Sequence, residues 1–241
     1  MAIHPTAIIS SKAKIDEHVE IGPFCVIGEV KIGAGSFIHP HVVIADGVEI
    51  GRDVEVFSGA FIGKEPKGAG ALARKPTFEK KIKIGDSCSI SPNAVIFYDV
   101  EIGSNTLLGD GASIREKCKI GSKCILSRYV TINYATTIGD RTKIMDSTHI
   151  TGNAVIGNDV FISILVGTTN DNVVREGYAE HVRGPVIEDH VVIGAGASLL
   201  PNIRIGKHST IAAGSVVTKN VDAGVLVAGV PARVIRQVEI A

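Results

Sequence analysis

The chain has 241 residues, with 25 Lys and Arg against 25 Asp and Glu, so its formal net charge at pH 7 is zero. A neutral chain has no overall attraction for nucleic acid or for an anionic membrane, and any recognition of phosphate must come from a local patch. Since no apolar run approaches the roughly 18 residues of a membrane span and the start, 1–5, lacks the basic and apolar regions of a secretory signal, we expect a cytoplasmic protein.

An aliphatic residue recurs at every sixth position along most of the chain. The runs cover 3–27, 32–62, 84–162 and 187–217, and one five-residue step separates the first two. A strict period of six fits neither the 3.6-residue period of a helix nor the alternation of a simple strand. It fits short strands that each place one residue inward before a turn. Three such strands close a triangular coil, so the 31 positions predict an all-β solenoid of about ten coils.

Two other positions of the repeat account for most of the cysteines and histidines. The third residue after the aliphatic one is often Gly, Asn, Asp or His, the types that best tolerate positive φ, and the fourth is usually small. Every cysteine occupies the small position, which favours packing over a disulfide or metal framework: Cys25, Cys88, Cys118 and Cys124. Four histidines occupy the turn position, where backbone tolerance explains them: His18, His41, His190 and His208.

The repeated unit I-G-x-x-A/S-x resembles that of the hexapeptide-repeat acyltransferases over nearly the whole chain. The resemblance implies a left-handed parallel β-helix and a homotrimer with active sites between subunits. Left-handedness comes only from the resemblance, because β-crossovers in general favour the right hand. We expect two inserted loops, 63–83 and 163–186, where a solenoid places function. We expect the β-helix domain to cover 1–220, and a short extension, 221–241, to close the coenzyme A end.

The first loop, 63–83, is the one strongly basic segment, with seven Lys and Arg against two Glu. Such a loop is commonly just solvated, and the alternative is contact with the phosphates of a nucleotide sugar or acyl carrier. From 27 to 86 the chain resembles the N-terminal part of the UDP-N-acetylglucosamine acyltransferases of lipid A synthesis. Those enzymes carry a catalytic His two residues after an aliphatic position, whereas Gly152 stands at the matching place after Ile150.

The segment 143–170 resembles bacterial N-acetyltransferases that act on nucleotide-linked amino sugars, following their K-I-x-N-N-x-x-V, D-D-V-F and F-T-N pattern. Their Asn pair is replaced here by Asp146-Ser147. His149 precedes an inward Ile and should point outward into a cleft. Acyl transfer from a thioester to an amine needs a base of near-neutral pKa, often oriented by a carboxylate. We therefore expect His149 to be the base, Asp146 to orient it or hold the sugar, and Ser147 to bind substrate.

Two alternatives to a catalytic His149 stay open. A lone surface His is commonly a solvated side chain, and an amine that arrives already neutral needs only to be positioned. A zinc site like that of the γ-class carbonic anhydrases would need three converging His, and His149 has no partners at a suitable register. We therefore expect no metal.

The second loop, 163–186, should form one wall of the sugar site. Its polar groups Asn170 and Asp171 are expected to bind the substrate. Arg175 and Arg183 are candidate phosphate ligands, and solvation explains both equally well.

The C-terminal part resembles the coenzyme A end of the hexapeptide acetyltransferases. Small residues let a pantetheine arm lie along exposed backbone and bond to it, and cationic side chains neutralise phosphates. The alternative is that these residues only serve the last turns, with the proline ending the β-helix. The expected coenzyme A contacts are Gly196, Ala213, Gly214, Lys219, Pro231 and Arg233.

These patterns predict an acyltransferase that uses acetyl-CoA to N-acetylate an amino sugar linked to a nucleotide, in the synthesis of cell-surface polysaccharide precursors. One alternative is an O-acyltransferase that transfers an acyl chain from acyl carrier protein to UDP-N-acetylglucosamine. Another is a non-catalytic β-helix scaffold. Nucleic acid and membrane are not expected partners.

Overall fold

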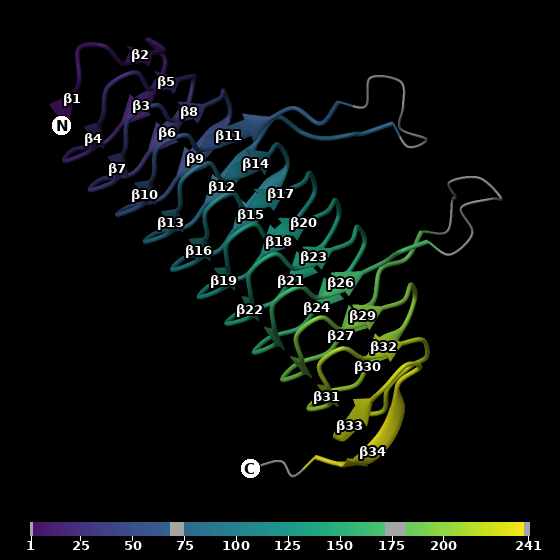
Figure 1. Cartoon of the computed structure of the whole chain (residues 1–241). Coiled ribbons are helices and arrows are strands. Elements are labelled where there is room, and N and C mark those ends of the chain that lie inside the picture. The colour runs from purple at the N-terminus through teal and green to yellow at the C-terminus, as the bar shows by residue number, and fades with distance from the viewer. Residues whose placement is uncertain (1, 68–74, 172–181, 239–241) are drawn as a thin grey trace.

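The computed structural model describes residues 2–67, 75–171 and 182–238. Within those residues every regular element is a β-strand, and the chain winds as a left-handed parallel β-helix with three flat sheets as its sides (Figure 1). The predicted fold class is therefore confirmed. In the same ranges, no helix has the length and hydropathy needed to cross a membrane.

The three sheets take the strands in rotation from β1 to β32, after which β33 and β34 both join sheet A. Sheet A contains β1 (Ala2–Ile3), β4 (Glu20–Ile21), β7 (Phe37–Ile38), β10 (Glu55–Val56), β13 (Ser89–Ile90), β16 (Leu107–Leu108), β19 (Ile125–Leu126), β22 (Lys143–Ile144), β25 (Phe161–Ile162), β28 (Val192–Ile193), β31 (Thr210–Ile211), β33 (Val225–Ala228) and β34 (Arg233–Gln237). Sheet B contains β2 (Ile8–Ile9), β5 (Val26–Ile27), β8 (Val43–Ile44), β11 (Phe61–Lys64), β14 (Val95–Phe97), β17 (Ser113–Ile114), β20 (Thr131–Ile132), β23 (His149–Ile150), β26 (Gly167–Thr168), β29 (Ser198–Leu199) and β32 (Val216–Val217). Sheet C contains β3 (Lys14–Ile15), β6 (Lys31–Ile32), β9 (Val48–Ile50), β12 (Ile82–Ile84), β15 (Val100–Ile102), β18 (Lys119–Ile120), β21 (Thr137–Ile138), β24 (Val155–Ile156), β27 (Val186–Ile187) and β30 (Arg204–Ile205).

The six-residue period exists because each short strand turns its second residue inward onto the same residue of the next coil. In sheet B, Ile96, Ile114, Ile132 and Ile150 stack in register, and each is at most 1% exposed. Burying one such side chain contributes about 1.5–3 kcal/mol. The core is therefore a column of aliphatic side chains along the axis, to which each coil adds one layer.

The corners of the triangle explain the cysteines and the turn histidines as predicted. His18, His41, His190 and His208 all have positive φ, between 57° and 62°. The four cysteines are free and buried, and each thiol donates to a backbone carbonyl oxygen. Burial raises the pKa of the Cys118 thiol to about 12, so this group is an inert packing residue.

Two details of the prediction were wrong. Sheet A contains twelve parallel strands before the antiparallel β34, so the solenoid has about twelve coils instead of ten. The second loop begins later than expected because β26 (Gly167–Thr168) continues the β-helix, with Thr168 at the inward position. The interruptions are 65–81, between β11 and β12, and 169–185, between β26 and β27. Both leave the same corner, between sheets B and C, and Figure 1 shows them on one side of the molecule.

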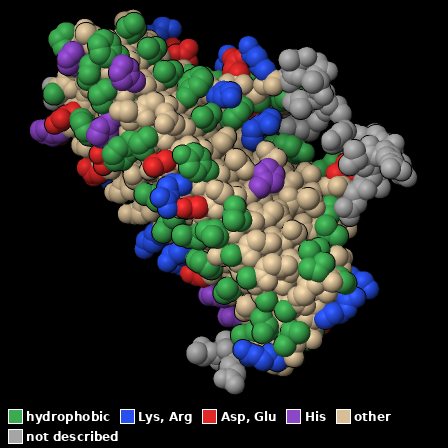
Figure 2. All heavy atoms as spheres, in the orientation of Figure 1, with side chains coloured by type: hydrophobic (Ala, Val, Ile, Leu, Met, Phe, Trp, Pro, Cys, Tyr) green, Lys and Arg blue, Asp and Glu red, His purple; other side chains and the backbone are tan. Residues whose placement is uncertain are grey.

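The outward faces of the three sheets differ in chemistry. Sheet C carries a column of charged side chains: Lys14, Lys31, Glu49, Lys83, Glu101 and Lys119. The corner between sheets A and B instead exposes large apolar side chains, including Phe24 (58%), Tyr129 (65%) and Leu165 (63%). In Figure 2 the surface beside the grey segments is mainly tan, the colour of uncharged polar side chains and backbone.

Candidate functional site

The outward column of sheet B changes character after the first loop. Its N-terminal part is apolar and includes Val26, Val43, Phe61 and Val95. From β17 onward the same column contains Ser113, Thr131, His149, Gly167 and Ser198. A small, uncharged and polar strip therefore runs along sheet B between the levels of the two loops, and His149 lies within it.

His149 is held by the coil before it. Its Nδ1 lies 2.7 Å from the hydroxyl of Thr131, and the next coil presents Gly167 at the paired position. A Cβ at Gly167 would meet no atom within 4 Å, so the space beside His149 is open. Desolvation lowers the pKa of His149, which favours the neutral form of the imidazole. A neutral, anchored imidazole beside an open slot can accept a proton from a nucleophile.

Asp146 does not reach His149 as an orienting carboxylate would. Its oxygens accept hydrogen bonds from the Ser127 hydroxyl and from the Arg128 guanidinium, at 2.6 Å for the latter. These hydrogen bonds, Ser127 first, lower the pKa of Asp146. The contact to His149 comes from Thr131 instead, so the structure does not bring together Asp146 and His149, which we expected to interact. Ser147 follows at the corner with φ +58°.

The corner between sheets B and C places an aromatic ring over Gly152. A Cβ at Gly152 would lie 2.6 Å from the ring of Tyr134, so a larger residue there would require the ring to move. The Asn170 amide donates to the carbonyl oxygen of Gly152 at 3.1 Å and lies 3.4 Å from the Tyr134 hydroxyl. The position of Gly152, two residues after the inward Ile150, is therefore covered by the Tyr134 ring.

The base of the second loop is tied across this corner. The backbone N–H of Arg183 donates to the carbonyl oxygen of Asn170 at 3.1 Å, and Asp171 is the last described residue on the N-terminal side of the loop. The structure thus brings Asn170 and Arg183 together. Arg175 lies outside the described residues.

The expected coenzyme A contacts lie on the last coils, on two different corners. Gly196 and Gly214 follow one another on the corner between sheets A and B with φ of +67° and +68°, and a Cβ at either would meet nothing within 4 Å. Nearer the N-terminus on this corner, the Asp146 side chain accepts a hydrogen bond from the backbone N–H of Arg128. The corresponding neighbour of Ala195 is Ala213, whose side chain has no acceptor to offer. This corner therefore offers open backbone.

The remaining coenzyme A candidates surround the C-terminal strands. The peptide bond before Pro231 is cis, and the following N–H, of Ala232, donates to Val216 at 2.8 Å. Arg233 is exposed in β34 and pairs with Ala228 of β33. Lys219 is exposed after β32, on the corner between sheets B and C. It thus lies apart from the open glycines.

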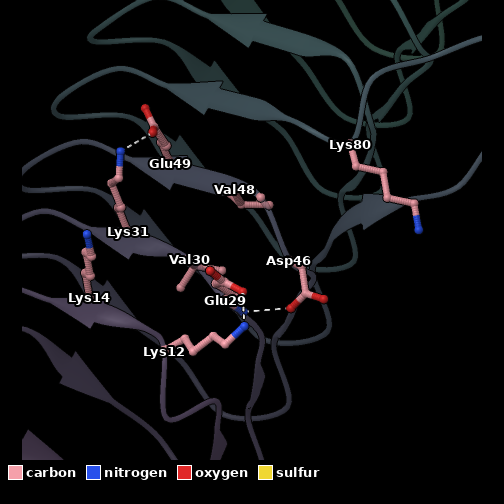
Figure 3. Close-up of a pocket in the computed structure, with 10 residues that line it drawn as sticks. Lys12, Lys14, Glu29, Val30, Lys31, Asp46, Val48, Glu49 and Lys80 are labelled. Atoms are coloured by element: carbon pink, nitrogen blue, oxygen red, sulfur yellow. Dashed lines mark hydrogen bonds and ion pairs between the residues drawn. The ribbon is translucent and has the colours of Figure 1, made fainter.

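In the described part of the chain, neither a metal-binding cluster nor a hollow on the N-terminal coils extends this site. Among the described residues, no group of three or more His, Cys, Asp and Glu is placed to hold a metal ion. A hollow of about 400 Å³ lies beside β6 and β9 (Figure 3). In it Lys31 pairs with Glu49 at 2.5 Å and Lys12 with Glu29 at 3.4 Å, so two of its four lysines have a carboxylate partner within the hollow. We do not assign this hollow to the site, because it lies on the N-terminal coils, far from His149.

Two segments, 29–64 and 184–219, match the family model of the bacterial transferase hexapeptide (six repeats). These two segments thus carry the hexapeptide type of repeat. It is 56% identical over 54 residues to 2,3,4,5-tetrahydropyridine-2,6-dicarboxylate N-acetyltransferase of Clostridium perfringens, covering 22% of this chain and 23% of that protein. It is 46% identical over 83 residues to serine acetyltransferase of Buchnera aphidicola, covering 34% and 28%. The chain thus spans less than a third of these relatives.

A solved structure resembles nearly the whole chain. LpxA from Acinetobacter baumannii shares 27% identity with a TM-score of 0.55, covering 98% of this chain and 74% of that chain. LpxA is a UDP-N-acetylglucosamine O-acyltransferase. The match confirms the resemblance and the fold.

Several residues at this site were not predicted from the sequence. They are Thr131, Arg128, Ser127 and Tyr134, and each contacts a residue of the following coil. A signal for them exists, since Thr131 and His149, like Arg128 and Asp146, stand 18 residues apart. Eighteen residues is the length of a regular coil, so contacts along the axis should be sought at that spacing.

Proposed function

We propose that this protein transfers an acetyl group from acetyl-CoA to the amine of a nucleotide-linked amino sugar. The observation that carries the proposal is the His149 imidazole, held by Thr131 on the polar strip of sheet B beside the open slot at Gly167. Two of the similar proteins are named as acetyltransferases, and a third acts on a nucleotide sugar. No metal takes part in the proposed reaction.

The donor would lie along the open backbone of the last coils. The Ala195 N–H is available to a pantetheine carbonyl, and the exposed Gly196 and Gly214 let the arm approach closely. Lys219 and Arg233 would neutralise the phosphates of coenzyme A. The C-terminal extension, 221–241, closes this end in our proposal, with Pro231 supporting its first turn. Because Gly196 and Gly214 lie beyond Gly167 along the axis, a thioester at the end of the arm points towards His149.

The reaction is then a direct attack. The amine nitrogen bonds to the thioester carbonyl carbon while His149 Nε2 takes the amine proton. For Nε2 to accept this proton, Nδ1 must be the protonated ring nitrogen and donate a hydrogen bond to the Thr131 hydroxyl oxygen. Collapse of the tetrahedral intermediate breaks the C–S bond, and the coenzyme A thiolate takes the proton from the imidazolium. The product is the N-acetylated sugar and free thiol.

The acceptor would be held by the walls around His149. Asp146 and Ser147 form the corner on one side, and Asn170 and Asp171 begin the second loop on the other, with Arg175 in its continuation. The Asp146 carboxylate already accepts from Ser127 and Arg128, and a carboxylate has capacity for further donors such as sugar hydroxyls. We thus assign Asp146 to sugar binding.

We also propose a homotrimer and a cytoplasmic location. The exposed apolar side chains at the corner between sheets A and B suit a subunit contact, whereas the charged column of sheet C suits water. A contact at this corner places the coenzyme A end beside a neighbouring subunit. Acetyl-CoA and nucleotide sugars are cytoplasmic metabolites, and four free cysteines are typical of a reducing compartment.

The deciding experiment is a thiol-release assay with acetyl-CoA against a panel of nucleotide-linked amino sugars. We expect turnover with at least one of them and a loss of about 10²–10⁴-fold in His149→Ala. The matched control is Thr137→Ala, an outward residue at the same place in its strand on sheet C. Absence of turnover with every amine would refute N-acetylation, and unchanged turnover in His149→Ala would remove it as the base.

The similarity to LpxA favours one second candidate, O-acylation of UDP-N-acetylglucosamine from acyl carrier protein. The donor distinguishes the two. An enzyme of this kind would be idle with acetyl-CoA and active with an acyl-loaded carrier protein. If calorimetry shows no binding of coenzyme A and no acyl donor supports turnover, the chain is a scaffold.

A further inference from the structure

Two cations share one aromatic ring at the edge of the polar strip of sheet B. Phe97 ends β14 and is only 8% exposed. The Lys64 ammonium, at the end of β11, lies 4.8 Å from the centre of this ring. The Arg115 guanidinium, directly after β17, lies 5.0 Å from it. The coils before and after Phe97 thus each direct a positive group over the same ring.

Arg115 is fixed by a carboxylate that is completely buried. The Glu116 side chain is 0% exposed, and Arg115 Nε and Nη2 donate to its two oxygens at 2.9 and 3.4 Å. Burying a carboxylate is costly unless it is paired, so a solvated surface arginine would not need this arrangement. The pair uses two of the five N–H donors of the guanidinium, and the others remain for a ligand because the Arg115 side chain is 25% exposed.

The neighbouring acids do not neutralise Lys64. Glu65 forms ion pairs with Lys80 at 2.6 Å and with Lys67 at 3.8 Å, and Glu79 pairs with Lys81 at 2.6 Å. Within the described residues Lys64 makes no ion pair, and its contact is with the ring. The site therefore has a net positive charge from Lys64 and directional donors from Arg115, which is the combination that binds phosphate oxygens.

The position of this pair along the axis relates it to His149. Arg115 follows β17, which lies two coils before β23, and the spacing of paired strands makes this about 10 Å. The intervening coil presents Thr131 and Asn133, which are polar. The open glycines Gly196 and Gly214 lie on the opposite side of His149 along the axis. The strip thus runs from the cation pair through His149 to the coenzyme A end.

We infer that Lys64 and Arg115 bind the diphosphate of the nucleotide that carries the acceptor sugar, with Phe97 as platform and Glu116 as the positioning residue of Arg115. The inference rests on the proposed function, since it assigns the other half of the same substrate. With the diphosphate on this pair, the attached sugar extends towards His149 and its amine faces the thioester. The phosphate ligands therefore lie on the coils around the first loop.

Direct binding tests this without any turnover. Isothermal titration of UDP and of dTDP is compared with that of uridine and thymidine, in wild type and in Lys64→Gln. We expect Lys64→Gln to weaken diphosphate binding about tenfold or more and to leave nucleoside binding unchanged. The matched control is Lys83→Gln, which removes an outward lysine of sheet C. Equal diphosphate affinity in wild type and Lys64→Gln would overturn the inference.

Arg115 needs a variant that does not leave the buried Glu116 carboxylate without this cation. The double variant Arg115→Gln/Glu116→Gln replaces the ion pair by a neutral one of similar size, and its fold is checked by thermal melting. We expect the same selective loss of UDP and dTDP affinity, with coenzyme A affinity unchanged. A folded double variant that binds UDP like wild type would contradict the role of Arg115.

The outcomes separate this inference from the proposed function. Diphosphate binding that depends on Lys64, in a protein that acetylates no amino sugar, would support the phosphate site and refute acetylation. Acetylation whose KM for the nucleotide sugar is the same in wild type and Lys64→Gln would support the enzyme and refute the phosphate site.

Discussion

His149 lies on the outward face of sheet B, and desolvation there lowers its pKa below the ordinary histidine value of about 6.5. The base form is therefore populated at lower pH than in a solvated histidine. We predict that kcat/KM for acetyl transfer rises with pH through an apparent pKa below 6.5 and is flat above it until other groups titrate. The measurement is a pH–rate profile of wild type and His149→Ala from acid to neutral pH. The same acid limb in the variant would assign it to another group.

Gly167 and Gly152 form a matched pair for separating activity from stability. A methyl group at Gly167 meets nothing within 4 Å but fills the slot beside His149. We predict that Gly167→Ala changes the free energy of unfolding by about 0.5 kcal/mol or less while kcat/KM falls at least tenfold. In Gly152→Ala the methyl would lie 2.6 Å from the Tyr134 ring, and we expect a loss of about 1–3 kcal/mol in denaturant unfolding. Full activity in Gly167→Ala would show that the substrates do not use this slot.

Sequence reasoning at the scale of single residues depended on the repeat. It correctly assigned each cysteine to the interior and each turn histidine to a positive-φ corner, because those positions are fixed by spacing within one coil. It found His149 as an outward residue for the same reason. It paired His149 with Asp146, three residues away, although the structure pairs Asp146 with Arg128 and His149 with Thr131, each one coil away.

At the scale of one strand, β26 was not predicted because of a single residue. Thr168 occupies the inward position but is not aliphatic, so the sequence placed the second interruption directly after Ile162. A loop there would leave the corner between sheets A and B. With β26 in place it leaves the corner between sheets B and C, as the first loop does, and the two loops lie on one side of the polar strip.

Thr168 is itself a testable element of that strand. Its hydroxyl accepts from the N–H of Thr151 at 2.8 Å, and the residue is 3% exposed. Thr168→Val restores an aliphatic repeat but leaves a buried N–H without its acceptor. We predict a loss of about 1–3 kcal/mol in urea unfolding, with Ser198→Ala, an outward substitution on the same sheet, near zero. A valine variant as stable as wild type would mean that the hydrogen bond contributes nothing net.

The whole molecule has one corner of exposed apolar side chains and one charged face, and this asymmetry was present in the sequence as outward residues of the repeat. The period predicted the solenoid itself, because every coil buries the same kind of column. It undercounted the coils, since β26 carries Thr168 and β33 follows a longer turn. The repeat of one chain does not specify how subunits are arranged. Only the exposed side chains indicate which surface forms the subunit contact.

Leu165 provides the test of that shared face, because it is 63% exposed at the corner between sheets A and B and lies one coil before Gly196. Leu165→Glu places a charge among apolar side chains that a subunit contact would bury, at a cost of several kcal/mol unless it finds a partner. We predict that wild type sediments as a trimer and that Leu165→Glu dissociates to folded monomers with little acetyl transfer. Lys83→Glu, on the charged sheet C, should stay trimeric and active. Because each subunit has its own aliphatic core, melting curves should show that both variants are folded. A Leu165→Glu variant that stays trimeric would place the subunit contact elsewhere.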